Sequence, residues 1–153
     1  MSLELDHVFI CVEEIATTER VLADFGIHFD PRTVHGGQGT ANACAFFDNA
    51  YLELLSPHDE RELRSPAVRP LALWDRIHWR RTGASPFGIA LRTEKVDLSI
   101  KTWPYEAAFL PPGKSIPIGR RQTPQTNRWC FSSRQRCRAV CVRRKRIAAS
   151  TVG

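Results

Sequence analysis

A glycine-rich bend followed by a strand–turn–strand pattern, within residues 36–55, constrains the fold of this 153-residue chain more than any other stretch. The bend contains three glycines, which can take a positive φ or let a neighbouring segment approach closely. Asp48 and Asn49 then separate two runs of small, aromatic and aliphatic residues, and both residue types tolerate the backbone of a tight turn. The stretch therefore predicts a β-hairpin, whose cross-strand pairs are Asn42 with Leu55, Cys44 with Glu53, and Phe46 with Tyr51.

The two faces of this hairpin differ in chemistry, because side chains alternate along a strand. One face is entirely apolar and is typical of packing surface; it consists of Ala41, Ala43, Ala45, Phe47, Leu52 and Leu54. The other face carries a carboxylate among aromatic and small polar groups; it consists of Thr40, Asn42, Cys44, Phe46, Tyr51, Glu53 and Leu55. The second face predicts the lining of a ligand pocket.

The rest of the first 119 residues predicts an α+β order of strands and short helices. Alternating polarity indicates strands and apolar side chains at helical spacing indicate helices, with glycines as stop signals. Strands are expected over residues 3–12, 27–34, 86–93 and 115–118, helices over residues 13–25 and 70–81, and a crossing loop over residues 56–69. Alignment of Glu13 with Glu94 shows a weak internal similarity, which predicts a second, unfinished β-α-β-β-β unit starting near Pro86.

Charge divides the chain into two unlike parts. The net charge is +6, from 22 Lys and Arg against 16 Asp and Glu. Residues 120–153 contain ten of these bases and no acid, so residues 1–119 carry 12 bases against 16 acids, a net charge of −4. This break predicts a basic, disordered tail outside the fold, such as a frame-shifted gene end would produce. Nucleic-acid binding through the tail is the weaker alternative.

Composition indicates a single cytoplasmic domain. The hydrophobic fraction of 42% and the charged fraction of 25% are ordinary for a globular protein. No apolar run approaches the ~18 residues of a membrane span. The N-terminus has acids within its apolar run and no basic leader, which argues against a signal peptide. The five cysteines are accordingly expected as thiols.

His7 and Glu53 are the strongest candidates for a functional site. Each lies in the middle of a predicted strand, and His7 shares a strand face with Phe9. An imidazole nitrogen and a carboxylate oxygen are ordinary ligands for zinc, manganese, iron or nickel. Glu53 in an apolar hollow could alternatively act as a general base. A purely structural interpretation also stays open, in which His7 is a core histidine and Glu53 pairs with an arginine.

Several segments resemble, in order, the vicinal oxygen chelate superfamily, and within it the glyoxalase-like group. The segments are LDHV, VHGGQGTANACAFF, AYLELL, SPAVRPLALWDRIHWRRTGASPFGIALRT and TWPYEAAFLPPGKSIPIG. The resemblance implies paired βαβββ modules whose curved sheets enclose a cleft. It predicts a glyoxalase-like domain over residues 1–119, with a first module at 1–57, a linker and helix at 58–85 and an incomplete second module at 86–119. Residues 120–153 would then form the tail.

In metal-dependent members of this superfamily, the first and fourth strands of each module supply ligands. The resemblance places His7 and Glu53 on the two positions of the first module. The second module departs from the pattern, because Gly88 lies at its first-strand position and no fourth strand is predicted there. Other pocket candidates are Thr40 and Asn42 as hydrogen-bond donors and Phe46 and Tyr51 as apolar walls. Phe46 and Tyr51 equally fit a simple cross-strand aromatic pair.

The resemblance implies a protein that binds a small oxygenated organic molecule. A divalent metal would assist a lyase, isomerase or dioxygenase reaction, with His7 and Glu53 as ligands or Glu53 as the base. The alternative is metal-free sequestration of an apolar or aromatic compound, as in bleomycin-resistance relatives. Because the second module is incomplete, the chain is also expected to pair with a second copy.

Overall fold

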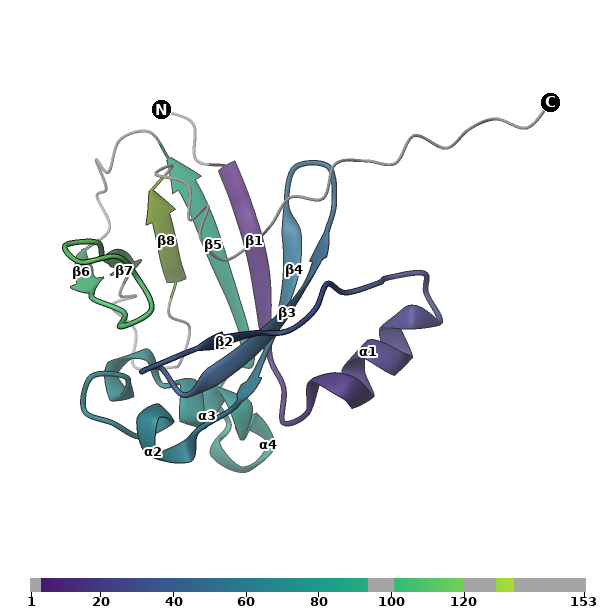
Figure 1. Cartoon of the computed structure of the whole chain (residues 1–153), viewed down its shortest axis with the longest axis horizontal. Coiled ribbons are helices and arrows are strands. Elements are labelled where there is room, and N and C mark those ends of the chain that lie inside the picture. Colours follow the sequence, from purple (N-terminus) through teal and green to yellow (C-terminus); the bar gives the residue numbers. More distant parts are fainter. Residues whose placement is uncertain (1–3, 94–100, 120–128, 134–153) are drawn as a thin grey trace.

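The computed structural model describes residues 4–93, 101–119 and 129–133, which form an α+β fold around one mixed sheet (Figure 1). The sheet has eight strands in the order β2-β3-β4-β1-β5-β8-β7-β6. The strands are β1 (Glu4–Cys11), β2 (Thr33–His35), β3 (Thr40–Phe46), β4 (Tyr51–Pro57), β5 (Phe87–Thr93), β6 (Thr102–Tyr105), β7 (Ile116–Gly119) and β8 (Trp129–Ser133). The helices are α1 (Ile15–Ala23), α2 (Glu60–Leu63), α3 (Leu73–Ile77), α4 (Trp79–Thr82) and the 3₁₀ turn η1 (Arg69–Leu71). None of the described helices is long and apolar enough to span a membrane.

Two halves of the sheet repeat one pairing scheme. In the first half β1 pairs in parallel with β4, and in the second half β5 pairs in parallel with β8. The halves join where β1 and β5 run antiparallel. Residues 12–32 connect β1 to β2 and contain α1, whereas only residues 94–101 connect β5 to β6. The second βαβββ module is therefore shorter than the first in this connection.

The hairpin at the centre of the first half is confirmed in register. Asn42 lies opposite Leu55, Cys44 opposite Glu53 and Phe46 opposite Tyr51, as the Asp-Asn turn predicts. Its apolar face packs against α1, because Ile15 of the helix contacts Ala43 and Leu54 in a small buried cluster. Figure 1 shows α1 on this side of the hairpin and α2, α3 and α4 together near one end of the sheet.

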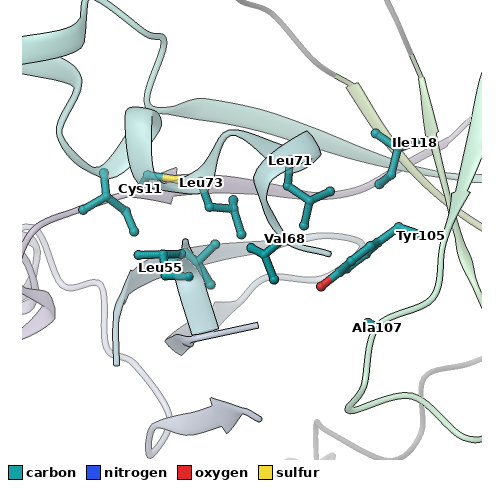
Figure 2. Packing of buried hydrophobic residues seen from close by; sticks show 10 residues of the cluster. Cys11, Leu55, Val68, Leu71, Leu73, Tyr105, Ala107 and Ile118 are labelled. Carbon is teal, nitrogen blue, oxygen red and sulfur yellow. The ribbon is translucent and has the colours of Figure 1, made fainter. Parts of the chain in front are cut away.

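The larger core lies between the other sheet face and the linker, residues 58–86. Figure 2 shows Cys11 and Leu55 of the sheet beside Val68, Leu71 and Leu73 of the linker. This packing covers only the end of the face near Cys11. Further along β1 and β4, His7 and Tyr51 remain partly exposed on the same face. The linker therefore leaves one end of the polar hairpin face open.

The linker departs from the predicted helix over residues 70–81 and loop over residues 56–69. Ala72, with a left-handed φ of 53°, separates η1 from α3, and His78, with φ −96° and ψ 34°, separates α3 from α4. The supposed loop contains α2, whose start is capped by the Asp59 carboxylate accepting from the backbone N–H groups of Arg61 and Glu62. Both errors have a local cause: two residues outside the helical region, Ala72 and His78, and a side-chain cap that precedes only one turn.

The second predicted strand and the predicted tail also need correction. Of the expected strand at 27–34, only Thr33 and Val34 belong to β2, which extends to His35; Pro31 lacks an N–H group to continue the ladder with β3. Residues 129–133 of the expected disordered tail form β8, a fourth strand for the second half that the sequence did not predict. Pairing on both sides, with β5 and β7, explains its position. The remaining tail residues, and with them the nucleic-acid alternative, lie outside the described residues, and the domain boundaries and homodimer remain predictions.

Candidate functional site

His7 and Glu53 are brought together on one face of the sheet by neighbouring strands. In the parallel pairing of β1 and β4, His7 lies level with Tyr51 and Phe9 lies level with Glu53. Alternation then points His7 and Glu53 to the same side. The Nε2 atom of His7 lies 3.3 Å from Oε2 of Glu53, and both side chains are largely shielded from solvent. The two groups form an ion pair across the strands.

Asn42 holds the second oxygen of the Glu53 carboxylate. Its Nδ2 donates to Oε1 at 2.6 Å from the neighbouring strand β3. Burial raises the pKa of Glu53, but the hydrogen bond and charge of His7, together with the bond from Asn42, outweigh burial and hold the pKa below its ordinary value. Glu53 is therefore ionised at neutral pH, with both oxygens engaged.

A β-bulge adds Asp6 to this cluster. The register between β1 and β5 shifts between Leu5 and His7, and such a shift breaks strict alternation. The Nδ1 atom of His7 consequently donates to Oδ2 of Asp6 at 2.8 Å. Burial lowers the pKa of His7, but its hydrogen bonds and attraction to Asp6 and Glu53 prevail and raise the pKa to about 9. His7 is an imidazolium between two carboxylates.

Arg92 of β5 contacts the acidic side chains at the exposed end of the cluster. Its Nη1 lies 3.7 Å from Oδ1 of Asp6 and its Nε lies 3.3 Å from Oε2 of Glu4. Its Nη2 also donates to the backbone carbonyls of Leu5 and Asn49, so it joins the start of β1 to the hairpin turn. These contacts hold Asp6 in place against His7.

An aromatic row borders the cluster. The rings of His7 and Tyr51 stack with centroids 4.4 Å apart, and those of Tyr51 and Phe46 lie 5.2 Å apart. Phe46 is 48% exposed, although it is a large apolar side chain. The two rings thus form the cross-strand aromatic pair, and their role as walls of a ligand pocket remains a prediction.

Thr40 lies apart, in a second polar cluster. Its side chain is 0% exposed, and its hydroxyl donates to Oε1 of Gln38 at 2.7 Å. The Thr40 oxygen then accepts from Nδ1 of His35 at 3.1 Å, and Nε2 of Gln38 donates to the Tyr105 hydroxyl at 3.3 Å. The hydrogen bonds of Thr40 are used inside the fold, so this geometry does not favour Thr40 as a ligand donor.

The metal interpretation fits only in part. His7 and Glu53 offer two donor atoms at a separation that one ion with ~2 Å bonds could bridge. Across residues 4–93 and 101–119, however, no group of three His, Cys, Asp or Glu side chains could hold a metal ion. At the corresponding position of the second half, Gly88 offers no ligand. The described residues therefore do not fit a metal centre with three or more protein ligands.

Asp6 and Arg92 were not predicted as site residues. Strict alternation of side chains along a strand assigns Asp6 to the opposite face from His7, and Arg92 joins the site through Asp6. The second cluster was missed because it joins β2, the bend and β6, which are distant in sequence. The one available signal was the presence of two polar residues in the bend: His35 directly precedes its glycines and Gln38 lies between Gly37 and Gly39.

Solved structures with a similar fold include two methylmalonyl-CoA epimerases. A hypothetical protein from Bacillus halodurans is 16% identical with a TM-score of 0.57, over 89% of this chain and 99% of that one. A Streptomyces coelicolor methylmalonyl-CoA epimerase variant, in complex with 2-nitronate-propionyl-CoA, is 20% identical with a TM-score of 0.56, over 86% and 96%. The Mycobacterium tuberculosis methylmalonyl-CoA epimerase is 15% identical with a TM-score of 0.52, over 84% and 87%. Identities this low show a shared fold alone.

The family assignment comes from the sequence itself. No curated protein matches this chain. The family model of the glyoxalase-like domain, however, matches residues 5–131, from the start of β1 into β8. That range includes both halves of the sheet, the linker and the clusters around His7 and His35. The chain therefore belongs to the glyoxalase-like domain family, within the vicinal oxygen chelate superfamily.

Proposed function

We propose that this protein binds a small oxygenated organic molecule against the open end of the polar hairpin face and moves a proton at the carbon next to its carbonyl group. The observation that supports this is the buried Glu53 carboxylate, held between the His7 imidazolium and the Asn42 amide beside partly exposed rings. A carboxylate and a charged donor in direct contact supply a base and an electrophile at one place.

The ion pair suggests how the two groups would act. A ligand carbonyl oxygen that accepts a hydrogen bond from Nε2 of His7 displaces Oε2 of Glu53. Glu53 then loses its strongest stabilising contact while it stays buried, and burial without that contact raises its pKa. The freed carboxylate takes the α-proton, and His7 stabilises the negative charge on the enolate oxygen. Return of the proton from Glu53 to carbon completes an exchange or isomerisation.

Acyl-CoA thioesters are suitable first probes. Their α-protons are acidified by the neighbouring carbonyl, and a structural neighbour was solved with 2-nitronate-propionyl-CoA. A metal-assisted lyase or dioxygenase reaction, by contrast, would require ligands beyond His7 and Glu53, which the described residues do not supply. Proton transfer by the side chains alone is the reaction that this site supports best.

The test is exchange of α-protons for deuterium in D₂O, followed by NMR, with methylmalonyl-CoA, propionyl-CoA and a simple α-hydroxyketone as probes. Glu53→Gln keeps the side-chain shape but removes the base, and a loss of roughly 10²–10⁴-fold is expected. Glu60→Gln is the matched control, because Glu60 is exposed and pairs with Arg64 on the surface. Equal exchange rates in the wild type and Glu53→Gln would contradict the proposal.

The aromatic row favours sequestration as a second candidate function. An exposed Phe46 beside stacked Tyr51 and His7 offers a surface for a flat ring. In that case aromatic compounds would raise the melting temperature without any proton exchange. The stabilisation would survive Glu53→Gln and disappear in Tyr51→Leu, which is the opposite of the pattern expected for the enzyme.

A further inference from the structure

Gly88 occupies the position in the second half that His7 occupies in the first. The alignment that sets Glu13 over Glu94 also sets His7 over Gly88 and Phe9 over Ala90. The strand pairing agrees with it, because Phe9 lies level with Glu53 in β4 and Ala90 lies level with Cys130 in β8. The second half therefore presents no imidazole where the first half presents one.

The ring of Phe9 fills the place where a side chain of residue 88 would stand. Phe9 and Gly88 are direct partners across β1 and β5. A Cβ atom built on Gly88 would lie 1.9 Å from Cζ and 2.1 Å from Cε1 of Phe9, far inside van der Waals contact. Glycine within a strand often marks such a close approach. Any ligand-bearing residue at this position would have to displace the ring.

A buried positive charge lies over the Phe9 ring. The Arg76 guanidinium is 5.9 Å from the centre of the Phe9 ring, and Arg76 is 2% exposed. Its Nη1 donates to the backbone carbonyls of Ser85 and Phe87, at 3.1 and 2.8 Å, which fixes the group at the start of β5. An apolar ring backed by a fixed cation is an unfavourable environment for a second cation.

We propose that Phe9, seated on Gly88, is an apolar plug in place of the second-half metal ligand, and that the His7–Glu53 pair consequently acts as a direct ion pair without a metal ion. This inference and the proposed function share the side chains of His7 and Glu53, and the inference rests on the proposed function in no other way. Its test measures metal affinity rather than proton exchange, so the two proposals can fail independently.

The experiment is a Co²⁺ titration of the full chain, followed by visible absorption and by metal analysis after dialysis. The wild type is expected to retain no stoichiometric Co²⁺. Phe9→Ala combined with Gly88→His removes the plug and supplies an imidazole, and a gain in Co²⁺ affinity of about tenfold or more is expected, because about 1.4 kcal/mol from the added ligand is enough for tenfold. Phe9→Ala with Gly88→Ala is the matched control, because it opens the same space without a donor. Gly88→His alone is expected to gain nothing, since the ring still blocks the side chain.

Two results would overturn the proposal. The first is one equivalent of Co²⁺ on the wild type that is lost in His7→Ala and in Glu53→Gln, and this result needs no engineered variant to fold. The second is equal Co²⁺ affinity in the His-bearing double variant and its Ala-bearing control, when circular dichroism shows both to be folded. That outcome would mean that the Phe9 ring does not prevent a metal ligand at position 88.

Discussion

Two histidines on one sheet face behave in opposite ways. His7 lies between the carboxylates of Asp6 and Glu53, and their attraction raises its pKa to about 9. His35 instead contacts the neutral side chain of Thr40 and stacks on Phe109, and burial lowers its pKa despite a weaker attraction to Glu53. Similar burial therefore leads to a charged and a neutral imidazole. The immediate neighbours decide which group can take part in charge-dependent chemistry.

Among the changes to these two sites, removal of the Glu53 carboxylate should lower the free energy of unfolding the most. Glu53→Ala leaves the His7 charge facing only Asp6 and the Asn42 amide without its acceptor. Loss of one partner of a buried pair should lower the free energy of unfolding by about 3 kcal/mol. Urea denaturation measures the change. Glu60→Ala, which removes an exposed partner of Arg64, should cost less than about 1 kcal/mol, and equal costs would show that Glu53 is not stabilised by its pair.

The two histidines should give stability opposite dependences on pH. Because the folded pKa of His7 lies above its unfolded value, its contribution is fully present below about pH 6.5 and is lost as pH rises through about 9. The stability difference between wild type and His7→Gln should therefore shrink by roughly 3 kcal/mol over that range.

His35 has a lowered folded pKa, so its contribution is present above its unfolded pKa and is lost as pH falls below it. The stability difference between wild type and His35→Gln should shrink on acidification rather than on alkalinisation. Urea denaturation at a series of pH values measures both variants. The same pH trend in both would contradict the assigned environments.

Thr40→Val tests the hydrogen bonds that surround the neutral imidazole of His35. The substitution keeps the side-chain shape but removes the hydroxyl that links His35 to Gln38. The unsatisfied groups that remain should cost about 1–2 kcal/mol in thermal or urea unfolding. Thr18→Val in α1, where Thr18 is only partly buried and its hydrogen bond is exposed, is the matched control, with a change within about 0.5 kcal/mol. An unchanged free energy of unfolding in Thr40→Val would mean that water replaces the hydroxyl.

The smallest effect is expected at the aromatic row. Phe46→Ser removes a ring that is 48% exposed and contacts Tyr51. An exposed cross-strand pair contributes roughly 0.2–1 kcal/mol, so unfolding should change by no more than that. Binding of an aromatic probe, measured by calorimetry, should weaken more clearly than stability. An unchanged affinity would exclude this ring from the binding surface.

Sequence analysis predicted the first half of the molecule well because its determinants are local. The Asp48-Asn49 turn sets the hairpin register, and the apolar alternation assigns Ala43 and Leu54 to the face that α1 covers. Convergence of His7 and Glu53 then follows from the parallel pairing of the first and fourth strands. Each of these inferences uses residues that are close in sequence or a pairing that the family resemblance implies.

The missed features depend on contacts between distant segments. The bulge at Asp6 forms where β1 meets β5. β8 comes from a stretch of biased composition, and its place is set by pairing with β5 and β7 rather than by its own sequence. Local propensity cannot reveal any of these, because tertiary pairing overrides it.

One contact of the glycine bend has a consequence for how the molecule opens. The Glu62 carboxylate of α2 accepts from the backbone N–H groups of both Gly37 and Gly39, at 2.7 and 3.1 Å. A Cβ atom on Gly39 would also lie 2.3 Å from the Asp59 carbonyl oxygen, so the backbone of the bend packs closely against the backbone of the linker. The two amides should therefore exchange with solvent hydrogen in a single shared opening event. Glu62→Gln should accelerate exchange at both positions together while the amides of β1 keep their protection.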